Sequence, residues 1–544
     1  MRNKTPPGTD RESTASGVTD AVRMTVERRL SYLTSVSESS TGGITSLRLK
    51  RNPFQDIGFR YEILGGPVAA GGFAEVFRVR DLSSNEVRAA KRVPKDRISD
   101  NIGLRRELEI LLTLDHPNVV RLFEWFESVD SIWLIQELCE GGEVLSLVGH
   151  CESREALRVI RQVLLGLAYI HDRGVIHRDV KLENCLFQSL DRSVVKIIDF
   201  GLSGVSEVSS TEPSRSGQTT PTVTGKTGTG LYLAPELYVR DPSRRIKYTP
   251  KCDVWAVGIM AYILLTGEHP FWDKTKPYLE DDVVSRLNET EADVSGILPE
   301  AAADLLRHLL EKDPESRFTS HEALMHPCMR VSAFLGSPMH AQLMSNLRTF
   351  KEFRPLERVI LTLIAYHCHD ETTAAMREVF SLLDTDLNGV LSKQEIIVGM
   401  QRLGLVVPPD FDAILDSIDA DHSGAIDFTE FVAAGLGADQ VRSAANTAFS
   451  WLSNSQSSVI TAADLEKVVD QEETVRVLTS YGYCGEISRD EFTSLIADIA
   501  ARKEVEEPIA LVRTVSKRRY SWDQNADTSP KLSPLRRHSE SRNP

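Results

Sequence analysis

The chain has 544 residues, more than a single hydrophobic core normally holds, so we expect two or more domains. Its formal net charge of −15, from 78 acidic and 63 basic residues, argues against a general nucleic-acid binder and favours a solvated acidic face or cation sites. Seven cysteines without CxxC spacing are most simply interpreted as reduced thiols of an intracellular protein, and we expect a cytoplasmic location.

The two ends of the chain have compositions typical of disordered segments. Residues 1–54 are rich in Ser, Thr and charge, and residues 508–544 are net basic and rich in Ser and Pro. Apolar residues at helical spacing within the first segment predict a short amphipathic helix; a transit peptide is the alternative, and Asp20 and Glu27 argue against it. The opening MRNKTPPG has no apolar signal core and no glycine at position two, so it indicates neither secretion nor N-myristoylation.

Residues 61–329 contain a series of short motifs whose order matters more than any one of them. The loop VAAGGFAEV is followed by a strand-like run, VRAAKRV, that presents Lys91, and by a helical stretch with Glu107 on one face. The strand SIWLIQ leads into a Gly–Gly turn, and VIHRDVKLEN, VKIIDFG and LAPEL follow. The apolar run at residues 257–265 is much shorter than the roughly 20 residues that cross a bilayer, so it predicts a buried helix and no integral membrane segment.

This ordered set resembles the protein kinase family. A lone HRD or DFG triplet occurs often by chance, whereas the ordered combination of lysine, glutamate, HRD-x-K-x-x-N, DFG and APE leaves an unrelated α/β domain as a remote alternative. The resemblance implies an α+β fold with two lobes, and it implies ATP and Mg²⁺ as cofactors, because phosphoryl transfer needs cations on the triphosphate and carboxylates on the metal.

The resemblance also assigns a role to each charged residue of these motifs. Lys91 would hold the α- and β-phosphates, while Glu107 would fix that lysine. Asp179 would accept or orient the proton of the substrate hydroxyl, and Lys181 would offset charge on the γ-phosphate. The expected Mg²⁺ ligands are Asn184 and Asp199. The expected nucleotide contacts, besides Lys91, are Val68, Ala69, Gly71, Ala74, Val76, Glu137 and Cys139. Structural roles are expected for an ion pair between Arg317 and Glu236 and for Asp253, as an anchor of the catalytic loop.

The phosphate loop departs from the usual kinase pattern. Ala69 and Ala74 stand at two of its three glycine positions, and only Gly71 is retained. Because alanine is costly mainly where φ must be positive, we expect a stiffer loop that still works. A smaller departure is Leu182, which stands where the usual pattern has proline, and we expect it to have little effect.

A long insertion rich in Ser, Thr and Gly lies between the DFG and APE motifs. Thr224 and Thr227 are candidates for a phosphate that would pair with Arg178, which precedes the catalytic aspartate. A merely flexible surface insertion is an equal alternative.

Residues 371–500 contain the acidic residues expected to bind cations, in two twelve-residue loops that fit the EF-hand pattern. They read DTDLNGVLSKQE and DADHSGAIDFTE. Each offers the six or seven oxygens that a hard cation needs, with a glycine at the sharp turn, and solvated acidic turns are a weak alternative. The expected Ca²⁺ ligands are Asp384, Asp386, Asn388, the Val390 carbonyl, Ser392 and Glu395 in the first loop, and Asp419, Asp421, Ser423, Ala425, Asp427 and Glu430 in the second.

Two further loops, beginning at Ser453 and Ser480, keep the apolar residue at position eight but lack most of the charged ligands. We therefore predict four hands, of which the last two are structural: their loops pair through short strands and bind no metal. Because one helix–loop–helix unit cannot bury its apolar face alone, pairing is expected for the first two hands as well.

A kinase followed by four EF-hands resembles the calcium-dependent protein kinase family, and the likeness covers nearly everything between the tails. The junction, residues 330–370, has apolar residues on two helical faces, one before and one after Pro355. In that family such a junction blocks the substrate groove until Ca²⁺ opens the EF-hands, which then bind the helix as an intramolecular target. Here Glu352 and Glu357 dilute the basic character common in such junctions, and a linker helix packed on the kinase is the alternative. We expect a monomer.

The predicted function is a Ca²⁺-regulated Ser/Thr protein kinase. Glu143 and Glu183 occupy positions at which related kinases meet arginines ahead of the target residue, so we expect protein substrates with an R-x-x-S/T motif. Two alternatives are a pseudokinase scaffold whose EF-hands sense Ca²⁺, and a plain Ca²⁺ sensor or buffer, which leaves the catalytic motifs unexplained. The tails match the motif and offer autophosphorylation sites, with a chance match as the alternative, at Ser31, Ser516, Ser521 and Ser539.

Overall fold

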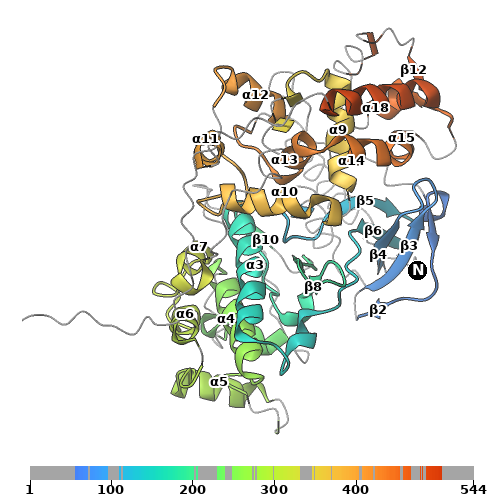
Figure 1. Ribbon diagram of the computed structural model, residues 1–544. Coiled ribbons are helices and arrows are strands. Elements are labelled where there is room, and N and C mark those ends of the chain that lie inside the picture. The colour runs from blue at the N-terminus through green and yellow to red at the C-terminus, as the bar shows by residue number, and fades with distance from the viewer. Residues whose placement is uncertain are drawn as a thin grey trace, which may run out of the picture. The chain divides into compact units, whose positions relative to one another are not determined.

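The structure is a computed structural model that describes most of the chain between residues 56 and 504 (Figure 1). All of the described residues belong to one unit of the chain, residues 1–509. The predictions for the two tails, the insertion before APE, Glu107 and Asp421 fall outside the described residues. The described residues are 56–71, 74–95, 110–111, 114–200, 204–205, 229–238, 248–272, 275, 279–297, 299–330, 346–347, 349–368, 370–402, 407–420, 423–453, 457–466, 474, 478–479, 481 and 485–504.

The first part of the described chain is an antiparallel sheet with the order β1-β3-β4-β6-β5, to which β2 is added by pairing with β3. Val79, Ala90 and Ile135 from its strands are fully buried in a small core. The predicted strand that presents Lys91 is β4. The elements are η1 (Ile57–Phe59), β1 (Tyr61–Ile63), β2 (Ala69–Ala70), β3 (Glu75–Asp81), β4 (Val87–Pro94), β5 (Leu122–Glu127) and β6 (Ser131–Gln136).

A helical lobe follows the sheet. Helix α3 (Ser153–Asp172) packs against α4 (Lys251–Thr266), and α4 is buried along most of its length, which confirms the buried helix predicted at residues 257–265. Strands β7 and β8 precede and follow the predicted catalytic loop, residues 177–184, and they pair with β10 and β9, respectively. The other elements are η3 (Val144–Leu147), β7 (Val175–Ile176), η4 (Leu182–Asn184), β8 (Cys185–Phe187), β9 (Val195–Ile197), β10 (Gly204–Val205), η6 (Thr229–Tyr232), η7 (Pro235–Leu237), α5 (Glu280–Glu289), α6 (Glu300–Leu309), α7 (Ser320–Met325) and η8 (Pro327–Met329).

The remaining helices form the EF-hand region, which has its own hydrophobic core. A backbone bridge between Leu391 and Ile426 joins the first two loops. The last two loops are joined by an antiparallel pair of short strands in which Ile460 lies opposite Ile487, so the predicted pairing of these loops is confirmed. The elements are α10 (Asp370–Leu383), α11 (Lys393–Arg402), α12 (Phe411–Ile418), α13 (Phe428–Gly435), α14 (Ala438–Ser443), α15 (Ala445–Leu452), β11 (Val459–Thr461), α16 (Ala462–Leu465), β12 (Glu486–Ser488) and α18 (Arg489–Glu504).

The junction contributes helix α9 (Pro355–His367), which packs against α13 and α15. Its apolar residues lie in the same core as those of the EF-hand helices. Glu357, which is fully buried in α9, pairs with Arg354 and with Arg502 of α18, the latter at 2.5 Å. The described part of the chain is therefore a sheet-rich lobe, a helical lobe and a mainly helical EF-hand region, as the predicted α+β fold requires.

Candidate active site and calcium loops

The phosphate loop is a β-hairpin. Ala69 lies opposite Val76 in the pairing of β2 with β3, and the Val68 amide donates to the Val76 carbonyl at 2.8 Å. Across the tip, the Gly71 amide donates to the Ala74 carbonyl at 2.9 Å. Among the described residues other than glycine, those with positive φ do not include Ala69 or Ala74. Neither alanine is therefore strained by this backbone.

The predicted phosphate-binding lysine and one predicted metal ligand lie side by side. Lys91 projects from β4, directly opposite Val76 of β3. Its Nζ lies 2.9 Å from Oδ1 of Asp199, whose side chain is half exposed. Asp199 has a φ of 66°, in the left-handed region that only a few non-glycine residues adopt. This strained position holds an acidic side chain against the lysine.

The catalytic loop assembles the other predicted site residues around Asp179. Lys181 Nζ donates to Asp179 Oδ2 at 2.7 Å, and Asn184 Nδ2 donates to the same oxygen at 2.8 Å. Asn184 Nδ2 also reaches the backbone carbonyl of Asp179 at 2.9 Å. The Asp179 carboxylate is thus held by the Lys181 ammonium and the Asn184 side-chain amide, and the three residues lie within one short stretch of the chain.

Asp253, at the start of α4, holds this loop in place. Its carboxylate accepts hydrogen bonds at 2.9 Å from the backbone amides of His177 and Arg178, and it contacts His171 Nε2 at 2.9 Å. Burial alone would raise the pKa of Asp253, but His171 and these hydrogen bonds lower it overall, so the side chain is an anion. The predicted anchoring role is confirmed.

The predicted ion pair of the larger lobe is also present. Arg317 donates from two guanidinium nitrogens to the two carboxylate oxygens of Glu236, at 2.8 and 2.9 Å. Arg317 is buried and also donates to the carbonyls of Glu311, Lys251 and Lys312. The pair ties the APE segment to the region after α6.

The segment after β6 holds Glu137 and Cys139, two of the predicted nucleotide contacts. The side chain of Glu137 pairs with Lys196 of β9 at 2.9 Å and accepts a hydrogen bond from Gln188. Burial raises the pKa of the Cys139 thiol, so that side chain is neutral. The Glu137 side chain and its backbone amide, which donates to the Arg121 carbonyl at 3.0 Å, are therefore both occupied within the protein.

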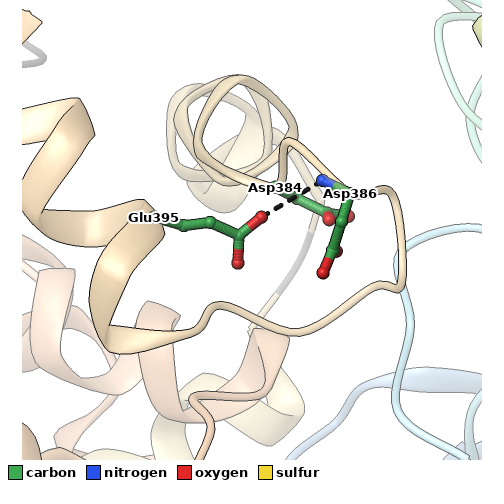
Figure 2. Close-up of side chains that lie close together, drawn as sticks. All are labelled: Asp384, Asp386 and Glu395. Carbon is green, nitrogen blue, oxygen red and sulfur yellow. Dashed lines mark hydrogen bonds between the residues drawn. The ribbon is translucent and has the colours of Figure 1, made fainter.

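The first metal loop gathers three carboxylates. Side-chain oxygens of Asp384, Asp386 and Glu395 lie within 4.8 Å of one another (Figure 2). Backbone amides orient them: Asp386 N donates to Glu395 Oε1 at 3.2 Å, the contact drawn in Figure 2, and Gly389 N donates to Asp384 Oδ2 at 3.1 Å. Asn388 lies in the same loop and accepts from the Val390 amide at 2.9 Å.

These residues fit a divalent cation. Burial, together with the neighbouring carboxylates of Glu395 and Asp386, raises the pKa of Asp384 to about 7. Two of the three carboxylates, those of Asp384 and Glu395, are buried. A cation beside the Asp384 carboxylate would stabilise its ionised form, and carboxylate and carbonyl oxygens are the ligands that Ca²⁺ prefers.

The second metal loop has the same local geometry. The amides of Ser423 and Gly424 donate to the two oxygens of Asp419, both at 2.9 Å. Glu430 N donates to Asp427 Oδ1 at 2.8 Å, and Asp427 N donates back to Glu430 Oε2 at 3.0 Å. The Ala425 carbonyl, a predicted ligand, accepts from the Ser423 hydroxyl at 2.9 Å.

The first metal loop also contacts the helical lobe of the predicted kinase region, residues 61–329. Leu387, within this loop, packs against the core of that lobe. Gly389 lies so close to it that an added Cβ would be 2.6 Å from Tyr169 Cδ2 and 2.8 Å from His116 Cδ2. The metal loop is thus seated on buried aromatic rings of the kinase region.

The second metal loop contacts the kinase region through polar groups. The amide of Thr429, which directly precedes Glu430, donates to Asp115 Oδ2 at 2.9 Å. Arg121 donates to Asp115 Oδ1 at 3.1 Å, to Thr429 Oγ1 at 3.4 Å and to the carbonyl of Tyr366 in α9 at 2.5 Å.

Sequence reasoning did not find these contact residues. The available signal for Asp115 and Arg121 was weak: they are charges within LLTLDHPNVVRLF, a stretch otherwise rich in apolar residues. Such charges are usually paired when buried, but the sequence does not name the partner. Leu387 gave no signal, because an apolar residue is common in a metal loop.

Comparisons with known proteins agree with this geometry. A protein kinase domain model matches residues 63–329, and a model of an EF-hand domain pair matches residues 373–434. These two domains imply ATP with a divalent metal, and Ca²⁺, respectively.

Three curated relatives are similar over most of their length. Calcium-dependent protein kinase 11 of Oryza sativa subsp. japonica is 31% identical over 420 residues, which cover 75% of this chain and 70% of the relative. Calcium-dependent protein kinase 3 of Plasmodium yoelii yoelii is 32% identical, with 69% and 68% covered, and calcium-dependent protein kinase 8 of Arabidopsis thaliana is 30% identical, with 80% of each covered. Among the helices in the described part of the chain, none combines the length and hydropathy that a membrane span requires. The chain belongs to the calcium-dependent protein kinase family.

Proposed function

We propose that the chain transfers the γ-phosphate of ATP to Ser or Thr hydroxyls of protein substrates, and that Ca²⁺ bound at the first two EF-hands raises this activity. The observation that carries the proposal is the arrangement around Asp179, whose carboxylate is held by Lys181 and Asn184. A loop that had lost catalysis would have no need to keep three such groups in mutual contact.

Each residue then has one task. Asp179 accepts or orients the proton of the attacking hydroxyl, and Lys181, 2.7 Å away, places positive charge beside the phosphoryl group in transfer. Bound ATP with Mg²⁺ supplies the phosphoryl group and neutralises its charge. Lys91 holds the α- and β-phosphates, and Asn184 and Asp199 provide the oxygens for the metal.

Regulation is assigned to the second half of the chain. We propose the domain bounds 61–329 for the kinase, 330–370 for the junction and 371–500 for the four EF-hands. The junction is the intramolecular target of the EF-hands, in a monomer. The burial of α9 among the EF-hand helices supports this role. The third and fourth hands serve as structural partners without metal.

Substrate choice is proposed to favour arginine ahead of the target residue. Glu143 is exposed and Glu183 is partly exposed, so both can meet a cationic peptide. The hydroxyl of Tyr232 donates to Glu183 Oε2 at 3.4 Å, which orients that carboxylate.

The test is phosphate transfer from labelled ATP to an R-x-x-S peptide over a range of free Ca²⁺. We expect activity to rise with Ca²⁺, with a midpoint on the order of 10⁻⁷ to 10⁻⁵ M as in sensor proteins. Lys91→Met and Asp179→Asn should abolish transfer. Glu395→Gln and Glu430→Gln should move the midpoint to higher Ca²⁺ while transfer at saturating Ca²⁺ persists.

The outcomes separate the alternatives. Activity that ignores Ca²⁺ would reject the regulatory half of the proposal. Ca²⁺ binding and nucleotide binding without any transfer would identify a pseudokinase, and Ca²⁺ binding without nucleotide binding would identify a plain sensor. A peptide with Ala in place of Arg serves as the control for substrate choice.

A further inference from the structure

A chain of buried polar contacts runs from the second metal loop toward the nucleotide site. It begins at Thr429, which lies between the predicted ligands Asp427 and Glu430. Thr429 is buried, and its amide donates to Asp115 Oδ2 at 2.9 Å. The carboxylate of Asp115 thus caps the first turn of α13, the helix that carries Glu430.

The next link is the ion pair of Asp115 with Arg121. The two side chains are only 16% and 15% exposed, and their closest atoms are 3.1 Å apart. Burial would raise the pKa of Asp115, but Arg121 and Thr429 lower it overall, and the pKa of Arg121 is raised by Asp115 against the effect of burial. Both side chains are therefore charged. The Arg121 guanidinium also donates hydrogen bonds to Thr429 Oγ1 and to the Tyr366 carbonyl of α9.

The last link joins Arg121 to Glu137, in the segment after β6 that is predicted to contact the nucleotide. The amide of Glu137 donates to the Arg121 carbonyl at 3.0 Å, and the Arg121 amide donates to Glu137 Oε2 at 3.4 Å. The same carboxylate pairs with Lys196 at 2.9 Å, and Lys196 is three residues before Asp199. One connected set of polar contacts therefore runs from the second metal loop to Glu137 and Lys196, beside the predicted nucleotide site.

The energetics make this set sensitive to docking of the metal loop. Removing one partner from a buried charge is strongly destabilising. If α13 moves away, Asp115 loses the Thr429 amide, and Arg121 loses the Thr429 hydroxyl. Because the backbone of Arg121 is hydrogen-bonded to Glu137, a shift of the Asp115–Arg121 pair would also move Glu137 and the segment after β6.

We propose that Asp115 and Arg121 are positioning residues that couple Ca²⁺ occupancy of the second metal loop to nucleotide binding at the Glu137 segment. The inference rests on the proposed function and specifies how its nucleotide site is regulated. Coupling between two binding sites is reciprocal, so a nucleotide must strengthen Ca²⁺ binding by the same factor as Ca²⁺ strengthens nucleotide binding.

The experiment measures binding, so it does not require turnover. Ca²⁺ is titrated into the full chain with and without a non-hydrolysable ATP analogue, and the reverse titration is made with and without Ca²⁺. In the unmodified chain we expect the analogue to lower the half-saturating Ca²⁺ concentration by about five-fold or more, the lower end of allosteric couplings. In Asp115→Asn and in Arg121→Lys, we expect this shift to fall below about two-fold in both directions.

Arg80→Met is the matched control, because Arg80 is another arginine of the sheet lobe whose ion pair, with Glu62, is exposed. It should keep the full shift. A shift that persists in Asp115→Asn and Arg121→Lys would overturn the proposal, and so would the absence of any shift in the unmodified chain. A thermal unfolding midpoint accompanies each variant. Asp115→Asn changes charge with little change in shape, and it carries the test if Arg121→Lys is too unstable.

A kinetic readout separates positioning from general damage. At saturating Ca²⁺, Asp115→Asn should raise the KM for ATP and leave the peptide KM unchanged. Equal rises in both KM values would indicate a loosened fold and contradict the proposal. If the unmodified chain binds both ligands with reciprocal coupling but transfers no phosphate, the proposed function fails while this inference stands.

Discussion

Gly389 and Gly424 occupy the same position in the two metal loops, so one substitution can be compared in two surroundings. Both have positive φ, 76° and 84°. Alanine in that conformation costs about 1–2 kcal/mol. At Gly424 an added Cβ meets no atom of the described residues within 4 Å, whereas at Gly389 it would lie 2.6 Å from Tyr169 and 2.8 Å from His116. Both of these rings are buried, so neither can easily give way.

The expected magnitudes differ accordingly. Gly424→Ala should cost about 1–2 kcal/mol, from backbone strain alone. Gly389→Ala adds an overpacking cost of about 1–3 kcal/mol, so the total is about 2–5 kcal/mol. The added part arises only while the first metal loop lies on the kinase region. The chain can relieve it by lifting the loop, which uncovers Leu387 and the rings beneath.

Hydrogen exchange measured by mass spectrometry on the full chain tests this reasoning. Gly389→Ala should speed exchange both in the first metal loop and in the half of α3 that carries Tyr169, by about 5- to 150-fold for a 1–3 kcal/mol change. Gly424→Ala should leave α3 unchanged. Equal exchange of α3 in the two variants would refute the idea that this contact holds the loop on the kinase region.

Two further predictions concern stability. Burial, with smaller effects from Lys196 and Arg173, lowers the pKa of His116 to about 3, below its unfolded value of about 6.5. The contribution of His116 to the free energy of unfolding is therefore fully present above pH 6.5 and falls by up to about 1.4 kcal/mol per pH unit below it. His116→Gln should therefore make the thermal unfolding midpoint fall less steeply with decreasing pH on the acid side. An unchanged slope would contradict this prediction. Arg317→Met should cost about 3–5 kcal/mol in urea unfolding because Glu236 is left without its partner, and a loss under about 1 kcal/mol would be inconsistent with the buried pair.

Much of the fold could be predicted from sequence, because its parts depend on local pattern. The strand that carries Lys91, the buried helix α4 and the pairing of Ile460 with Ile487 each follow from periodicity or from a short motif. The contacts of Asp179, Lys181 and Asn184 could be anticipated for the same reason, since these residues are near neighbours in the chain.

The contacts between distant segments could not be predicted. Asp115 and Thr429 are far apart in sequence, and each has an ordinary role in its own motif. Only the three-dimensional structure shows that the Thr429 amide donates a hydrogen bond to the Asp115 carboxylate. The same holds for Leu387, whose burial depends on a surface of the kinase region that its own loop does not specify.

The core of the EF-hand region begins well before its first metal loop. Leu347, Phe350 and Phe353 precede α9, and they are buried in the same cluster as the helices of the hands. The buried Glu357 of α9 is then tied to Arg502 near the end of α18. An exchange of regulatory regions between related kinases would therefore have to start at or before Leu347. A swap that began at the first metal loop would separate the incoming hands from the helix on which their core is built.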